Sequence, residues 1–169
     1  MNLVSFCESL NSNIKDGDII VPDGGGSFFE PMRHIWCKRD MRFVVSGLGT
    51  MGWALPAAIG AWFARPDSRI ICIIGDGGWQ LSMQEWATVM HHHIPLKVFY
   101  MNNGGYQTIH DTQQKFFGRF IGCNHNTGIS FPPIADIIHA YDMTIYTQDI
   151  GEAFKCLMPV LCEVILDRP

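Results

Sequence analysis

Short, continuously apolar runs alternate along this chain with longer segments whose apolar residues recur at helical spacing. The runs Arg69–Gly75 and Leu96–Met101 are almost wholly apolar, which is typical of parallel strands buried on both faces. The pattern predicts further strands over residues 19–21, 42–46, 143–146 and 160–166. It predicts helices over residues 3–14, 54–64, 83–92, 108–117, 133–140 and 151–157. This alternation predicts an α/β fold, with a doubly wound, mainly parallel sheet and helices on both faces.

Two segments lack either pattern. Residues 22–27 form a glycine cluster that we expect to be a loop passing close to a ligand, and residues 120–131 are also expected to be a loop. No repeat, low-complexity segment or linker divides the chain. With 169 residues, it is expected to be a single domain, residues 1–169.

Composition narrows the class of protein. The 12 basic and 16 acidic residues give a net charge of −4 with no basic run, which argues against a nucleic-acid partner. The lack of an 18-residue apolar stretch or a signal-peptide pattern predicts a cytoplasmic protein with no membrane partner. The six cysteines form no CxxC pair, and Cys72 and Cys162 lie in apolar runs, so we expect buried thiols rather than disulfides or a zinc site.

Polar residues follow two of the predicted strands. Gly75-Asp76-Gly77 ends the first, and Asn102-Asn103 ends the next after 24 intervening residues. The carboxyl ends of parallel strands share one sheet edge, where ligands bind. A carboxylate and a carboxamide there supply hard oxygen ligands for Mg²⁺ or Ca²⁺, and the glycines admit a phosphorylated group. The alternative is that Asp76 caps a helix and the asparagines form a turn.

These residues resemble a known family. The stretch GDGGWQLSMQEWAT, followed by NNGGY, resembles the pyrophosphate-binding domain of thiamine diphosphate (ThDP) enzymes, whose motif is GDG, about two dozen residues, then NN. The segment SGLGTMGWALPAAIGA, residues 46–61, strengthens the match, and NNGGYQTI with a later QQKFF resembles acetolactate-synthase-like proteins. The similarity covers residues 16–167, nearly the whole chain. A generic Mg²⁺-dependent phosphate-binding domain leaves GLGTMG unexplained.

The resemblance implies Mg²⁺ and ThDP as cofactors. It places Mg²⁺ on Asp76, Asn103 and the Gly105 carbonyl, with two diphosphate oxygens and a water completing the shell. We expect Asp76 and Asn103 to be exposed strand-end residues that contribute little to the core. The resemblance assigns cofactor contacts to a further set of residues: Gly26, Ser27, Gly49, Met51, Gly75, Gly77, Gly78, Trp79 and Tyr106. Gly78 departs from the family's frequent serine, but its N–H at a helix start can serve the same purpose.

Two of these residues match positions that meet the aminopyrimidine half of the cofactor. The Gly49 carbonyl would accept a hydrogen bond from the 4′-amino group, and the Met51 side chain would wedge between the two rings and enforce a bent conformation. The alternative for Met51 is core packing. Two other polar features are expected to be structural: His91-His92-His93 at a helix C-terminus, because adjacent helical residues diverge by about 100°, and Glu85 on a helix surface.

The resemblance also implies a partner. In this family the glutamate that activates the cofactor belongs to a separate pyrimidine-binding domain, and no segment here resembles that domain. We therefore expect a homo- or hetero-oligomer, in which an apolar surface around Met51, Trp53 and Trp79 meets a pyrimidine-binding domain or subunit. The implied activity is decarboxylation of a 2-oxo acid with release or transfer of the resulting unit. The alternative is a non-catalytic ThDP-binding or regulatory paralogue.

One position bears on the outcome of the reaction. In similar pyruvate decarboxylases a glutamate lies six residues after the metal-binding asparagine and delivers the proton with which aldehyde leaves. Here that position is Ile109, which cannot deliver a proton, and His110 is expected to point elsewhere. The sequence therefore predicts carboligation rather than simple decarboxylation.

Overall fold

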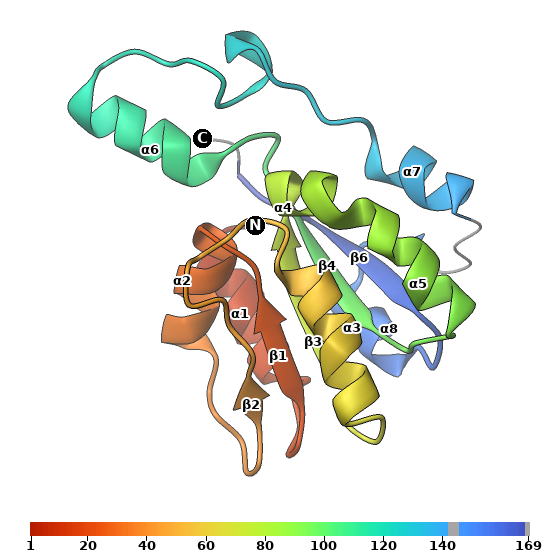
Figure 1. Cartoon of the computed structure of the whole chain (residues 1–169). Coiled ribbons are helices and arrows are strands. Elements are labelled where there is room, and N and C mark those ends of the chain that lie inside the picture. Colours follow the sequence, from red (N-terminus) through yellow and green to blue (C-terminus); the bar gives the residue numbers. More distant parts are fainter. Residues whose placement is uncertain (142–145, 168–169) are drawn as a thin grey trace.

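A six-stranded parallel sheet forms the centre of the computed structural model, which describes residues 1–141 and 146–167 (Figure 1). The strand order is β2-β1-β3-β4-β6-β5, and every pair of neighbours is parallel. The strands span Ile19–Pro22 (β1), Arg42–Phe43 (β2), Ile70–Gly75 (β3), Lys97–Asn102 (β4), Tyr146–Thr147 (β5) and Val160–Ile165 (β6). The two predicted central strands are β3 and β4. The doubly wound α/β fold is confirmed.

Helices cover both faces of this sheet (Figure 1). One face carries α1 (Leu3–Asn11), α2 (Gly26–His34) and α8 (Ile150–Lys155). The other carries α3 (Ala54–Ala64), α4 (Asp76–Ser82), α5 (Trp86–His91) and α7 (Ile134–Ala140). Because the strands are apolar on both faces, two hydrophobic layers form, one centred on Phe6 and Phe99 and the other on Trp79 and Trp86.

Three predicted elements need correction. Residues 26–34 form α2, so Gly26 and Ser27, which were expected to end a loop over residues 22–27, begin a helix instead. The helix expected over residues 83–92 begins earlier, at Asp76, and continues through a 3-10 turn, Met83–Glu85, into α5. The strand expected over 42–46 is only two residues long. The strand expected over 143–146 lies largely outside the described residues, although Tyr146 begins β5.

Helix α6 (Gln107–Phe116) lies beyond the carboxyl edge of the sheet, and none of its residues is buried (Figure 1). The connection after it contains a 3-10 turn, His125–Thr127, and an isolated antiparallel bridge between Asn124 and Gly105, so the predicted loop over 120–131 is largely correct. The loop is tied back to the sheet edge, because the Tyr106 N–H donates to the Cys123 carbonyl at 2.8 Å. It is also tied to α6, where the Gln113 side chain bonds both the N–H and the carbonyl of Ile121, at 2.8 and 2.9 Å.

All six cysteines are free thiols, and Cys72 and Cys162 are fully buried, as predicted, whereas Cys37 is exposed and Cys156 is half-buried. Burial raises the pKa of Cys162 to about 12, so this thiol stays protonated. Within residues 1–141 and 146–167, no helix is long and apolar enough to cross a membrane.

Candidate functional site

A cavity of about 220 Å³ opens at the carboxyl edge of the sheet, where β1 and β3 end. From β1 the chain passes to β2 on one side and then to β3 on the other, so the two connections diverge and leave a crevice between them. Nearly all the predicted site residues line this cavity: Gly26, Ser27, Gly49, Met51, Gly75, Asp76, Gly77, Gly78, Asn103, Gly105 and Tyr106. Leu3, Met101, Thr108, Ile109 and Leu166 also line it.

The exception is Trp79. Its side chain is 1% exposed and packs in the core against Trp86 and Tyr100, with ring centroids 5.8 and 6.1 Å away. The side chain therefore does not line the cavity. It also cannot belong to the apolar surface that was expected around Met51, Trp53 and Trp79, and that expectation is wrong for this residue.

Helix α2 directs its N-terminus at the cavity. Its first two residues, Gly26 and Ser27, line the cavity, and Gly25 precedes them with φ of 67°. The first N–H groups of a helix have no partner within the helix and carry partial positive charge. This segment, expected to be a loop, is therefore better suited to an anion than a plain turn, because the N–H groups converge.

Asp76 stands in the first turn of α4 and lies at the centre of a hydrogen-bond network. Its Oδ1 accepts from the Tyr100 hydroxyl at 2.7 Å. Its Oδ2 accepts from the backbone N–H of Asn103 at 3.2 Å and of Gly105 at 3.0 Å. The side chain does not cap α4, which argues against the helix-cap interpretation of the sequence.

The expectation that Asp76 and Asn103 are exposed is wrong, because only 2% of Asp76 is accessible and Asn103 is half-buried. Burial raises the pKa of this carboxyl group, while the bonds from Tyr100, Gly105 and Asn103 oppose the shift. A carboxylate kept in such surroundings costs stability unless something positive compensates it.

Asn102 and Asn103 have different partners. Asn102 Nδ2 donates to Glu163 on β6 at 2.6 Å, away from Asp76. Asn103 Oδ1 accepts from the Gly105 N–H at 3.2 Å, which turns the loop back toward Asp76. Of the two asparagines only Asn103 lines the cavity, as the resemblance implied.

Gly77 marks a close approach of three segments. A Cβ atom at this position would collide with Met51 Cε and with the Tyr106 ring. Met51 and Tyr106 therefore stand directly over the Gly77 backbone, and Met51, which is 39% exposed, is not core packing. Gly49 adopts φ of 65°, a conformation that glycine tolerates best.

Sequence reasoning gave no role to Asp23, which is 4% exposed and lines the same cavity. Its carboxylate accepts from the Gly52 N–H at 3.1 Å and the Ala54 N–H at 3.0 Å. Asp23 thereby ties the end of β1 to the start of α3 and fixes the Gly49–Gly52 turn. Gly78 packs so closely on this carboxylate that a Cβ would overlap it, which explains why serine is absent there.

Ile109 and His110 lie as the sequence predicted. Ile109 lines the cavity, whereas the His110 ring stacks on Phe120, with centroids 4.5 Å apart and planes 8° from parallel. Gln107 and Thr108 also line the cavity from the first turn of α6, and Ile109 is the aliphatic residue beside them.

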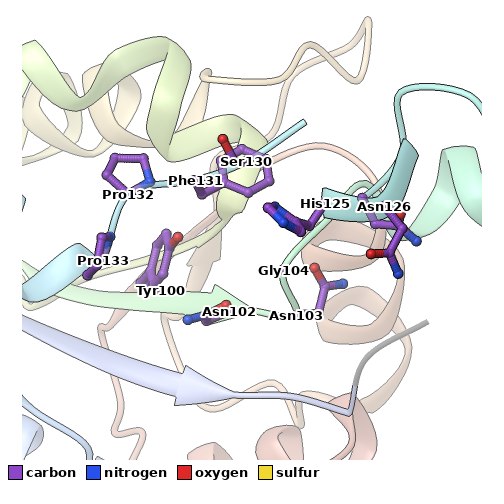
Figure 2. A pocket seen from close by; sticks show the side chains of 11 residues that line it. Tyr100, Asn102, Asn103, Gly104, His125, Asn126, Ser130, Phe131, Pro132 and Pro133 are labelled. Carbon is purple, nitrogen blue, oxygen red and sulfur yellow. The ribbon is translucent and has the colours of Figure 1, made fainter. Parts of the chain in front are cut away.

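A second cavity, of about 390 Å³, lies on the other side of Asn103 (Figure 2). Its floor is Tyr100 and Asn102 on β4, and its walls come from residues 124–126 and 130–133. The side chains that Figure 2 labels here are neutral amides, a histidine, a serine and apolar rings, with no carboxylate or ammonium group among them.

The donor set at the first cavity fits Mg²⁺ and a diphosphate. In the described residues, 1–141 and 146–167, no group of three or more His, Cys, Asp or Glu side chains could hold a metal by itself. A cation at Asp76 must therefore take its other ligands from amide and carbonyl oxygens and from a bound anion, as Mg²⁺ does at phosphate sites. The α2 N-terminus, where Gly26 and Ser27 line the cavity, can meet that anion.

The fold and this cavity define a cofactor-binding α/β domain, and comparison with known families identifies it. Residues 23–164 match the model described as "Thiamine pyrophosphate enzyme, C-terminal TPP binding domain", and the chain belongs to this family. Membership implies thiamine diphosphate with Mg²⁺ as the cofactor.

Its relatives place it in the acetolactate synthase branch. It is 30% identical over 164 residues to a probable acetolactate synthase large subunit of Methanococcus aeolicus, covering 92% of this chain and 27% of the relative. It is 40% identical over 108 residues to the acetolactate synthase isozyme 2 large subunit of Escherichia coli, covering 63% of this chain and 20% of the relative. For the acetolactate synthase large subunit of Pyropia yezoensis, identity is 45% over 126 residues, 72% of this chain and 21% of the relative. The chain thus spans about a quarter or less of these proteins.

Proposed function

We propose that this chain supplies the Mg²⁺–ThDP-binding half of an active site that decarboxylates a 2-oxo acid and transfers the resulting unit to a second carbonyl. The observation that carries the proposal is the convergence of Asp76, Asn103 and Gly105 with the α2 N-terminus around one cavity. Relatives named acetolactate synthase support this assignment.

Each group has a defined task. Asp76 supplies the charged oxygen for Mg²⁺, and Asn103 Oδ1 and the Gly105 carbonyl supply neutral oxygens. The N–H groups of Gly26, Ser27 and Gly78 bind the diphosphate. When bound, the cofactor serves as an electron sink for the negative charge left as CO₂ departs.

Residues on the other side of the cavity orient the cofactor rings. Met51 stands above Gly77 and would separate the two rings of a bound cofactor, and the Gly49 carbonyl would accept a hydrogen bond from the 4′-amino group. Asp23 holds the turn that carries both residues, because it bonds the N–H groups of Gly52 and Ala54. Ile109 lines the site and has no proton to give, so this position would not supply the proton that releases an aldehyde, which favours transfer to a second carbonyl.

The proposal includes a partner, a pyrimidine-binding domain or subunit that provides the activating glutamate. The chain itself is proposed to be a single ThDP-binding domain over residues 1–169. A group of exposed apolar side chains beside the cavity suits such a contact: Leu48 (93% exposed), Leu81 (60%), Met51 (39%) and Trp53 (37%). We call this group the Leu48 surface.

Reconstitution tests the function. The chain is copurified with its natural neighbours, bound ThDP is measured, and CO₂ release is followed with a panel of 2-oxo acids. Mg²⁺-dependent CO₂ release with a hydroxyketone or acetohydroxy-acid product supports the proposal. ThDP binding without turnover, in the presence of a pyrimidine-domain partner, favours the alternative of a non-catalytic or regulatory paralogue.

A further inference from the structure

Tyr100 is a buried residue of β4 whose hydroxyl donates a hydrogen bond to the candidate metal ligand Asp76. It pairs in register with Ile74 of β3 and is 3% exposed. Its ring lies edge-on to Trp79, with centroids 6.1 Å apart and planes at 75°. The phenol ring also forms part of the floor of the second cavity, and its packing on Trp79 together with the hydrogen bond to Asp76 restricts where its hydroxyl lies.

That place is 2.7 Å from Asp76 Oδ1. A carboxylate oxygen has two lone-pair directions. Both directions of Oδ2 are taken by the N–H groups of Asn103 and Gly105, at 3.2 and 3.0 Å. The Tyr100 hydroxyl takes one direction of Oδ1, which leaves a single lone pair for a cation.

We propose that Tyr100 is a positioning residue for the metal: its hydroxyl fixes the Asp76 carboxylate so that one Oδ1 lone pair meets a divalent cation. The inference rests on the proposed function of Asp76 as a metal ligand. Groups that hydrogen-bond a ligating side chain commonly change metal affinity by about 10- to 100-fold when removed. Tyr100 acts through Asp76 alone and has no contact with the cofactor in this assignment.

The competing explanation is that the hydroxyl only satisfies a buried carboxylate. The chain contains a matched comparison, because the Tyr146 hydroxyl donates to the Glu163 carboxylate on β6. Glu163 also accepts from Asn102 and Gln148, at 2.6 and 3.1 Å, and it does not line the first cavity. Tyr146→Phe therefore removes a phenol–carboxylate bond outside the candidate metal site.

The experiment uses the full chain with Mg²⁺ and ThDP. Wild type, Tyr100→Phe and Tyr146→Phe are titrated with Mg²⁺ by calorimetry at a fixed, saturating ThDP concentration, and each is unfolded by heat without metal. Tyr100→Phe is expected to weaken Mg²⁺ binding at least about tenfold. Tyr146→Phe is expected to keep the wild-type Mg²⁺ affinity, although it also loses a hydrogen bond.

A second measurement separates positioning from general damage. At Mg²⁺ concentrations high enough to fill the weakened site, Tyr100→Phe should bind ThDP with wild-type stoichiometry and affinity. Failure of excess Mg²⁺ to restore ThDP binding would assign the hydroxyl to the fold rather than to the metal, and would overturn the inference. Equal Mg²⁺ affinity in Tyr100→Phe and wild type would also overturn it.

Failure of this inference is distinct from failure of the proposed function. A wild-type chain without any Mg²⁺-dependent ThDP binding refutes the proposed function, and the inference with it. If wild type and Tyr100→Phe bind Mg²⁺ and ThDP equally well, only the role of Tyr100 is refuted.

Discussion

Replacing Asp76 by Asn is expected to stabilise the metal-free protein while removing its response to Mg²⁺ and ThDP. Asparagine keeps the shape and the three hydrogen bonds: its Oδ1 can accept from the N–H groups of Asn103 and Gly105, and its Nδ2 can donate to the Tyr100 oxygen. What changes is the negative charge. Asp76 is only 2% exposed, and a buried charge costs stability. A single stabilising substitution typically gives about 0.5–2 kcal/mol, and about 1 kcal/mol raises the unfolding midpoint of a domain of this size by about 2–4 °C.

The pH dependence of folding stability tests whether the buried charge of Asp76 is what destabilises the metal-free protein. Burial raises the pKa of Asp76 in the folded protein above its ordinary value of 3.8. A raised folded-state pKa means that the folded protein binds this proton more tightly than the unfolded chain does. The associated stability is present below pH 3.8 and is lost as pH rises through the folded-state value. The advantage of Asp76→Asn should therefore grow as pH rises through the folded-state pKa of Asp76 and should vanish toward pH 3.8.

Thermal unfolding of both proteins across this pH range, with and without ligand, is the assay. Mg²⁺ and ThDP at about 100 times the dissociation constant should raise the free energy of unfolding of wild type by about 2.7 kcal/mol. The same ligands should not stabilise Asp76→Asn. Asp18→Asn is the matched control, because Asp18 is also buried but pairs with Arg69 at 2.6 Å, so its loss should destabilise at pH 7. A lower midpoint for metal-free Asp76→Asn at pH 7, or an advantage that persists at acid pH, would refute the reasoning.

The remaining predictions concern the cofactor, the product and the partner. Asn103→Ala removes a neutral metal ligand and should abolish Mg²⁺-dependent ThDP binding by calorimetry with little loss of stability; unchanged affinity would remove Asn103 from the ligand set. Gly77→Ala places a methyl group against Met51 and Tyr106 and should weaken ThDP binding, and wild-type binding by this variant would show that the cofactor avoids this surface. With its partner, the protein should form hydroxyketones or acetohydroxy acids, and Ile109→Glu should shift product toward free aldehyde; aldehyde as the dominant wild-type product would contradict this role. Leu48→Ser removes an apolar side chain that is 93% exposed and should weaken self-association or partner binding in sedimentation experiments. A wild-type protein that is strictly monomeric and recovers no partner would argue against the Leu48 surface as a binding site.

Local pattern was enough to find the fold and the metal-site candidates. Asp76 and Asn103 directly follow or end apolar runs, and parallel strands bring such positions to one edge whatever the rest of the chain does. The family resemblance placed Ile109 at the cavity, and the angle of about 100° between adjacent helical residues placed His110 away from it. Helix α2 escaped this reasoning because glycines and Pro31 reduce helical propensity, while packing on α1 and the sheet stabilises the helix.

The sequence by itself determined which residue types stand at the strand ends, because hydrophobic periodicity and motif spacing are properties of neighbouring positions. Only the tertiary structure decided what those residues touch. The bond from Tyr100 to Asp76 joins residues 24 positions apart, and the bond from Ala54 to Asp23 joins residues 31 apart. Nothing local distinguishes Tyr100 from other apolar strand residues, or Trp79 from a cofactor contact. Their roles follow from which strand and which helix the folded chain packs against them, and long-range packing sets that arrangement.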